Sequence, residues 1–309
     1  MQNLDPQSHF TSADQMPWTV DAPFRVAPGL HRLQDGDGAL FVRDGRADVY
    51  RLAKQRRLAS GRAMAGVADE RVLQHIAMRY ESQYKSQCEN PTVDRTPIEP
   101  VTLALQMQED FVILHDHANG SGFTAEFFSV CFPSNWRPID KLGKDFLSIH
   151  APVADNTMLL KARQGIESIA FRQQSMVRHV WLLSPTPDLA QDPEERGVNW
   201  HTVLQETGKE SEALLSQVYF RVERQSTLPL PEINRAVFFI RIMVCPLVQV
   251  LQVDPSRAQA LSRTLASMSE AFLHYRGMQL LKDPLCDALE RFATGAHWST
   301  LPEKNNRGL

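Results

Sequence analysis

The sequence predicts an α+β fold, in which a mainly antiparallel sheet carries helical N- and C-terminal extensions. Apolar segments with strand character concentrate in the middle of the 309 residues, and helical spacing of apolar residues dominates towards both ends. The regular strand–helix alternation that favours a parallel sheet is absent from this pattern. No internal repeat or long low-complexity linker divides the chain. We therefore expect a flexible arm over residues 1–22, a single domain over residues 23–295 and a tail over residues 296–309.

Caps and apolar residues at helical spacing indicate the helices. Asp69 can cap a helix that runs to about residue 85. Asp254 followed by Pro255 is typical of a helix start, because proline is well tolerated at the first helical position. The other expected helices cover residues 46–58, 141–149, 155–172, 210–216, 255–275 and a last segment from residue 284. The basic residues of segment 46–58 are expected to face solvent.

Short apolar runs and strict alternation indicate the strands. Val218, Phe220 and Val222 share one face of segment 218–225, and the residues between them share the other. A stiff turn over residues 227–231 leads into the apolar run 236–244, so the two runs are expected to form an antiparallel hairpin. Other expected strands cover residues 39–42, 111–114, 123–132 and 177–183.

Composition limits the kinds of partner. A net charge of −3 gives no electrostatic reason to expect nucleic acid. No apolar run approaches the ~20 residues that span a bilayer, so we expect no membrane partner. The first residues lack the basic-then-apolar layout of a secretory signal, and we expect a cytoplasmic protein. The four cysteines are Cys88, Cys131, Cys245 and Cys286. They form no CxxC pair, which argues against a zinc or iron–sulfur site within this chain.

His150 is the first candidate metal ligand among ten histidines. It ends the expected helix 141–149, and Pro152 restrains the backbone just after it. A hydrogen-bonded packing histidine is the commoner role for such a residue. Other candidate ligands are His115, His117, His179 and His201, and the thiols of Cys131 and Cys245. Both cysteines lie in apolar strands, where an inert buried thiol is the usual explanation.

Charged residues on the expected hairpin form a second candidate cluster. Arg221 and Glu223 share one strand face, and Arg224 points oppositely. Arg241 lies within an apolar run, where an arginine is costly unless it is paired. One interpretation is an internal salt bridge between Arg241 and Glu223. We expect Arg224 and Arg241 to be buried.

An ordered set of short motifs resembles a known family. The motifs are QED at 108–110, CFPSNW at 131–136, KLG at 141–143, IHAPV at 149–153, VNW at 198–200, RVERQ at 221–225 and FFIRI at 238–242. Together they resemble the DUF3445 family, which includes haem-dependent oxidative N-demethylases similar to PAS domains. The resemblance spans roughly residues 23–278. The family usually has an arginine directly before VNW, whereas this chain has Gly197 there and Arg196 one position earlier.

The resemblance implies a PAS-like haem-binding domain. Haem would be of the b type and non-covalently bound, because the chain lacks the CxxCH motif of covalent attachment. The residues implied are His150 as the iron ligand, Arg221, Arg241, Lys141 and Trp136 as haem-binding residues, and Glu223 and Arg224 as catalytic residues. Glu223 would receive an amine substrate, and the arginines would bind haem propionates or stabilise reduced dioxygen.

The implied activity is the removal of a methyl group from a small secondary amine with dioxygen, with release of formaldehyde. Electrons would come from NADPH through a separate reductase that carries flavin and an iron–sulfur cluster, because this chain has no Gly-rich dinucleotide motif. Two alternatives stay open. One is a non-catalytic PAS-like sensor of haem or a small ligand. The other is a haem-free interaction protein, which the difference at Gly197 keeps possible.

Overall fold

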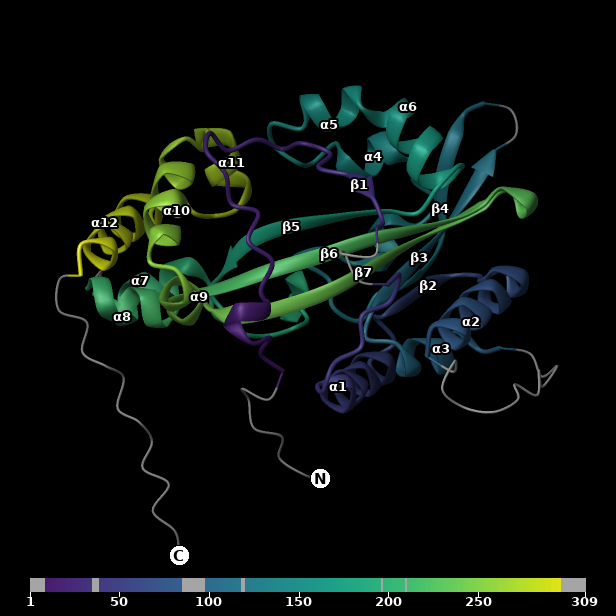
Figure 1. The fold of residues 1–309 in the computed structure, drawn as a ribbon, viewed down its shortest axis with the longest axis horizontal. Helices are drawn as coiled ribbons and strands as arrows, with labels where there is room; N and C mark the ends of the chain where they lie inside the picture. The colour runs from purple at the N-terminus through teal and green to yellow at the C-terminus, as the bar shows by residue number, and fades with distance from the viewer. Residues whose placement is uncertain are drawn as a thin grey trace, which may run out of the picture.

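In the computed structural model, seven strands form one antiparallel sheet surrounded by helices (Figure 1). The structure describes residues 9–34, 39–84, 98–117, 120–195, 197–208 and 210–295. The strand order is β1-β5-β6-β7-β3-β4-β2, and each neighbouring pair is antiparallel. The predicted mixture of helices with a mainly antiparallel sheet is confirmed.

The hairpin of β6 and β7 forms the middle of the sheet. The strands are β1 His31–Arg32, β2 Met64–Gly66, β3 Asp110–His117, β4 Gly122–Ser129, β5 Met176–Ser184, β6 Tyr219–Leu230 and β7 Arg235–Pro246. Most of the expected turn over residues 227–231 is instead the end of β6, and the chain turns through a 3₁₀ turn, η6 Pro231–Ile233, and Asn234 with φ 52°. Leu228 and Leu230 are buried there, and their burial outweighs the hydrogen bond that Pro229 cannot donate.

Helices form in the expected segments with several interruptions. The helices are α1 Ala47–Ala59, α2 Glu70–Tyr84, α3 Pro100–Gln106, α4 Phe146–His150, α5 Thr157–Lys161, α6 Arg163–Ile166, α7 Trp200–Thr207, α8 Ser211–Ser216, α9 Leu247–Val253, α10 Ser256–Ala266, α11 Glu270–Tyr275 and α12 Lys282–Ala293. Of these, α3, α7 and α9 form outside the expected segments. The expected helix 141–149 is divided into a 3₁₀ turn, η3 Pro138–Lys141, and α4. Gly143 separates them with φ 73°, and its N–H donates to Ala125 O on β4. The expected helix 255–275 breaks before Ser269, which caps α11.

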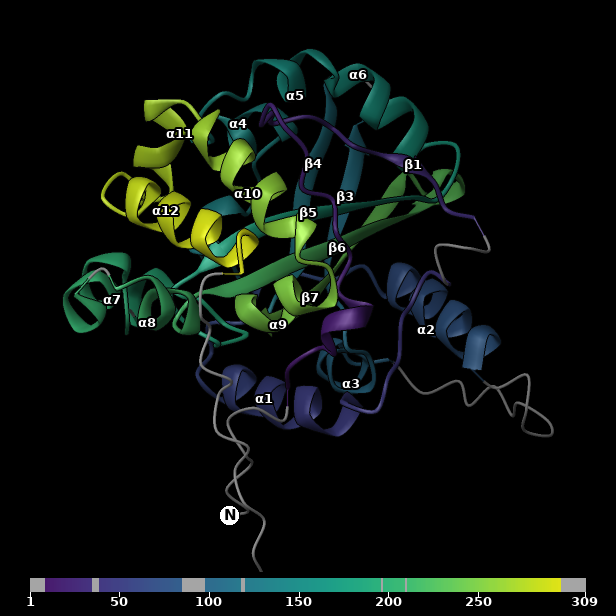
Figure 2. The same ribbon diagram turned by 60° about the vertical axis from the view of Figure 1, so that its left-hand side comes forward.

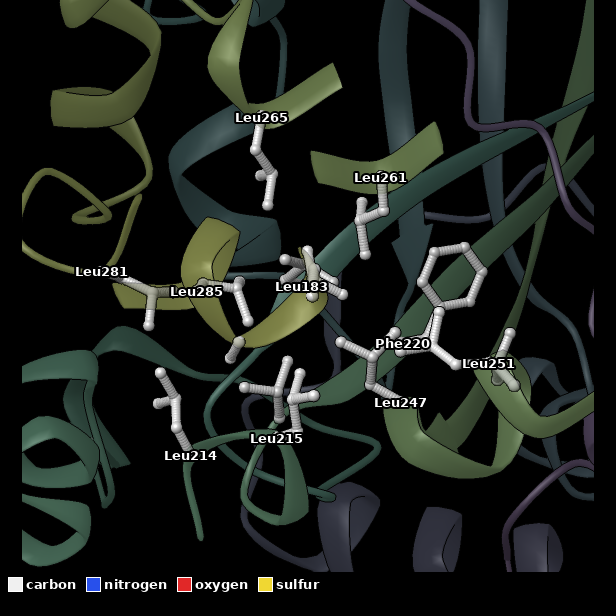
Figure 3. Close-up of a cluster of buried hydrophobic side chains, with 14 of the residues drawn as sticks. Leu183, Leu214, Leu215, Phe220, Leu247, Leu251, Leu261, Leu265, Leu281 and Leu285 are labelled. Atoms are coloured by element: carbon white, nitrogen blue, oxygen red, sulfur yellow. The ribbon is translucent and has the colours of Figure 1, made fainter. Parts of the chain in front are cut away.

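Helices cover the sheet in three groups (Figures 1 and 2). Helices α4, α5 and α6 lie over one face, α1, α2 and α3 lie on the other side, and α7–α12 gather at one end. A leucine-rich core fixes the last group to β5 and β6, with Leu183 and Phe220 facing leucines of α8, α9, α10 and α12 (Figure 3). The candidate site lies on the face beneath α4–α6.

Three expectations for the N-terminal part of the chain need correction. Residues 9–22 were expected in a flexible arm, but Thr11 and Met16 are buried, and Thr11 N–H donates to Val244 O at the edge of β7. The basic face of α1 was expected to be solvated, yet Lys54 and Arg57 are buried and paired with carboxylates. Segment 39–42 is irregular rather than a strand, because its carbonyl groups accept from arginine side chains of the sheet.

Some expectations fall outside the described residues: the tail 296–309, residues 1–8 of the arm, Cys88 and Arg196. Within the described part of the chain, no helix combines the length and the apolar character needed to cross a membrane.

Candidate functional site

A cavity of about 170 Å³ lies between the sheet and the α4–α6 cover. Its apolar wall is formed by side chains of the central strands and the covering helices: Val112, Leu114, Phe123, Ala125, Phe128, Phe146, Ile149, Ile166, Ala170, Phe171, Phe238 and Ile240. A single buried water needs only ~10–15 Å³, so this space can receive an organic group. A mainly apolar cavity with a few convergent polar groups is the usual form of a ligand site.

His150 lines the cavity at the end of α4. Asp145 caps this helix by accepting from Ser148 N–H at 2.8 Å. The His150 Nδ1 atom lies 2.8 Å from Phe146 O, and because a carbonyl only accepts, Nδ1 carries the proton and Nε2 keeps a lone pair. Burial lowers the pKa of His150 to about 4, although the bond to Phe146 opposes the shift. A neutral imidazole whose second nitrogen is already oriented is suited to bind a metal.

Three cationic side chains also line the cavity: Lys141 in η3, Lys144 just after it and Arg178 on β5. Burial lowers the pKa of Lys141 to about 8 and that of Arg178 to about 10, while the charge of Glu223 opposes both shifts. The Lys141 Nζ atom lies 4.2 Å from the centre of the Trp136 ring. Lys144 is an exposed residue overall, whereas Lys141 and Arg178 are partly enclosed.

Glu223 is the carboxylate that these cations share. It lies on β6, half-buried, and among the described residues it is the sole acidic side chain of the cavity lining. Ser134 Oγ donates to its Oε1, and Gln225 Nε2 donates to its Oε2 at 2.8 Å. With His150 neutral, the two enclosed cations Lys141 and Arg178 outnumber the one carboxylate, and exposed Lys144 adds positive charge at the rim. Because uncompensated buried charge is costly, the cavity favours an anionic occupant.

Four of the residues predicted from sequence meet at the cavity: His150, Lys141, Trp136 and Glu223. Arg221 lies beside them on the Glu223 face of β6, fully buried, and it donates to Ser134 Oγ at 3.2 Å. Its remaining N–H groups donate to the carbonyls of Phe132, Asp188 and Leu189.

Arg224 and Arg241 lie on the opposite face of the hairpin from the cavity. They are direct cross-strand partners, whereas Glu223 pairs with Ile242. The interpretation of an Arg241–Glu223 salt bridge is therefore wrong, because Arg241 pairs with Asp44 at 2.7 Å. Arg224 donates to the carbonyls of residues 39 and 40. The prediction that both arginines are buried is confirmed.

The alternative metal ligands lie away from the cavity lining, which contains neither cysteine candidate and no histidine besides His150 among the described residues. Burial raises the pKa of both Cys131 and Cys245 to about 12, so neither thiol is prone to form a thiolate. His117 bonds to Thr124 Oγ1, and His201 is exposed on α7. In the part of the chain that the structure describes, no group of three or more His, Cys, Asp or Glu side chains is placed to hold a metal ion.

A family described as haem-dependent oxidative N-demethylase, alpha subunit-like, has a model that matches residues 58–286, more than half of the chain. The chain belongs to this family. The family description includes haem dependence and oxidative N-demethylation, and its words alpha subunit imply a partner subunit. Its range includes His150, Lys141, Arg178 and Glu223.

The start of the VNW motif, which Gly197 precedes, lies apart from the cavity. Gly197 is exposed and is absent from the cavity lining. Trp200 of the VNW motif is buried in the core beside the C-terminal helices. The missing arginine before VNW therefore leaves the described walls of the cavity intact.

Sequence reasoning missed Arg178 and Gln225. The Arg178 Nε atom donates to Gln225 Oε1 at 2.6 Å, and the two residues are cross-strand partners on β5 and β6. Arg178 carries the same signal as Arg241, a charge within an apolar strand. Its place on the cavity face follows from the order of the strands, which no local pattern reveals.

Proposed function

We propose that this chain is the haem-binding subunit of an oxidative N-demethylase that removes a methyl group from a small secondary amine with dioxygen and releases formaldehyde. The observation that carries the proposal is a cavity whose lining joins one neutral histidine to an excess of positive charge. A b-type haem fits both features, because its iron accepts a single imidazole and its two propionates are anionic. In this proposal the sheet and its α4–α6 cover correspond to a PAS-like domain.

His150 would hold the iron through Nε2, since Nδ1 is occupied by Phe146 O. Lys141, Lys144 and Arg178 would pair with the propionates. The bound haem would supply the activation of dioxygen that oxidative demethylation requires. Trp136 and the apolar wall would exclude water from the reacting groups, and Glu223 would bind the protonated amine.

The remaining predicted residues receive different roles in the proposal. Arg221 supports the wall through Ser134, and Arg224 and Arg241 hold segment 39–44 against the sheet. We propose that these three act through the fold and not by contact with the haem. Electrons would come from a separate NADPH-dependent reductase with flavin and an iron–sulfur cluster, in keeping with the implied partner subunit, and a cytoplasmic location would suit that supply.

Replacing His150 with alanine tests the haem site. His150→Ala should fold, because the change removes one polar side chain at a helix end, but it should purify with little haem. Added imidazole should restore part of the binding. The control is His201→Ala, which changes an exposed histidine of α7 and should keep full haem. A His150→Ala protein with full haem and an unchanged Soret band would contradict the proposal.

Activity separates the enzyme from the alternatives. Dimethylamine, dioxygen and an electron donor should give formaldehyde with the haem-loaded protein. A Soret band without amine-dependent formaldehyde would instead support a sensor. Weak, non-saturable absorbance on titration with hemin would support a haem-free interaction protein.

A further inference from the structure

A chain of hydrogen bonds joins Glu223 to an arginine on each side. On one side Ser134 Oγ donates to Glu223 Oε1, and Arg221 Nε donates to that same Oγ at 3.2 Å. On the other side Gln225 Nε2 donates to Glu223 Oε2 at 2.8 Å, and Arg178 Nε donates to Gln225 Oε1 at 2.6 Å. Both oxygens of the cavity carboxylate therefore accept a hydrogen bond.

The chemistry of arginine fixes the direction of this chain. A guanidinium group can only donate and stays protonated in proteins. Ser134 must therefore accept from Arg221, which leaves its one hydroxyl proton for Glu223. Gln225 must likewise turn its oxygen to Arg178, so its amide nitrogen faces Glu223. The orientations of the hydroxyl and the amide follow from these partners and need no observed hydrogen atom.

Backbone contacts hold both arginines in place. Arg221 is 0% exposed, and its other N–H groups donate to Asp188 O at 3.1 Å and Leu189 O at 2.9 Å. Arg178 Nη1 donates to Pro28 O at 2.9 Å. The two ends of the chain are thus tied to segments far apart in the sequence, and Glu223 has little freedom to turn.

We propose that Arg221 and Arg178 are positioning residues that act through Ser134 and Gln225 to fix Glu223 as an anionic acceptor for a cationic N–H group in the cavity. The inference rests on the proposed function in taking an amine as the occupant. A carboxylate that already accepts two bonds from neutral donors keeps its charge for the ligand, and a fixed side chain loses less entropy on binding. Glu223 is therefore held with both oxygens ready to accept, and it binds the amine through the N–H group of the amine.

Calorimetric titration with dimethylammonium chloride tests this chain of hydrogen bonds. Ser134→Ala and Gln225→Met should each weaken binding about tenfold, because each removes one hydrogen bond to a charged group. Ser134→Thr keeps the hydroxyl and should restore binding. The double variant should weaken binding by less than the product of the two factors, since both changes act on one carboxylate. In turnover, KM should rise more than kcat falls.

Ser226→Ala is the matched control. Ser226 lies on the same strand but on the opposite face, where its hydroxyl donates to Leu40 O. This variant should bind dimethylammonium as the unchanged protein does. Unchanged affinity in both Ser134→Ala and Gln225→Met would overturn the inference, and so would an equal loss in Ser226→Ala.

Haem content is measured separately, and each titration is run with and without haem. If the protein binds no haem and the Ser134 and Gln225 effects still appear, the proposed function is contradicted and the hydrogen-bond chain is supported. If the haem-loaded protein shows neither the Ser134 nor the Gln225 effect, the hydrogen-bond chain is contradicted and the proposed function is not.

Discussion

Two groups of buried charges in this protein differ in their charge balance. In the group near α1 and β7, buried cations contact carboxylates directly: Lys54 Nζ lies 3.0 Å from Asp110, and Arg241, which shares Asp44 with Arg46, lies 2.7 Å from that carboxylate. In the group around the cavity, the enclosed cations Lys141 and Arg178 share the single carboxylate Glu223. Burial of a charge is common to both groups, so burial does not by itself indicate a binding site.

The charge balance determines whether each group needs a ligand. In the first group, partners within the protein offset much of the cost of removing the charges from water. These residues stabilise the fold and need no ligand. In the second group that cost is not fully offset, and a ligand of opposite charge would lower the free energy of the cavity. Three predictions test this difference.

The largest expected effect is on stability, at the Lys54–Asp110 pair. Both side chains are 0% exposed, and Asp110 also accepts from Phe132 N–H at 2.7 Å. Asp110→Ala leaves a buried cation without its partner and should reduce the free energy of unfolding by about 3–5 kcal/mol. Urea unfolding of the haem-free protein measures the loss.

Lys54→Met combined with Asp110→Ala should recover part of that stability, because no isolated charge then remains. A loss below about 1 kcal/mol in Asp110→Ala would show that water or another group already compensates this pair, and the distinction between the two groups would weaken.

Arg241→Met should also lower the free energy of unfolding, but by less than Asp110→Ala does. It removes the bonds to Asp44 and Val42 O, but Asp44 keeps Arg46 as a partner and is 24% exposed. We expect a loss of about 2 kcal/mol in unfolding free energy, with the haem content of the folded protein unchanged. Loss of haem without loss of stability would place Arg241 in the cofactor site, as the sequence predicted.

Much of the sheet could be predicted because its signals are local. The alternation of segment 218–225 and the apolar run after it predicted the β6–β7 hairpin. The end of β6 could not be predicted, since Pro229 reads as a turn residue until the burial of Leu228 and Leu230 is known. The break at Gly143 could not be predicted either. It depends on a contact distant in the sequence, because the Gly143 N–H donates to Ala125 O on an earlier strand.

The candidate site was predicted in part, for a related reason. His150, Lys141 and Trp136 lie close together in the sequence, and their motifs place them near one another. Arg178 and Arg241 give the same local signal, a charge within an apolar strand, yet they lie on opposite faces of the sheet. Their separation depends on strand order and register, which are properties of the whole fold.

Lys141→Met should have the smallest effect on the free energy of unfolding, and it should raise that free energy instead of lowering it. The Lys141 amine is charged at neutral pH, and burial lowers its pKa to about 8 from 10.5. Replacing it with an apolar side chain of similar length should stabilise the haem-free protein at pH 7 by about 1 kcal/mol, because the contact with Trp136 offsets part of the burial cost. Haem retention should fall in the same variant.

The pH dependence of the stability difference between Lys141→Met and the unchanged protein provides the sharper measurement. Between pH 8 and 10.5 the unfolded chain binds more protons at Lys141 than the folded chain does, so the stability of the unchanged protein rises with pH in that window. The advantage of Lys141→Met should therefore be largest below pH 8 and shrink as the pH rises from 8 to 10.5. Unfolding free energies of both proteins, measured without haem from pH 7 to 11, give this difference directly. If Lys141→Met is instead less stable at pH 7, or if the difference does not change with pH, the charge of Lys141 is balanced within the protein, and the cavity belongs with the structural group.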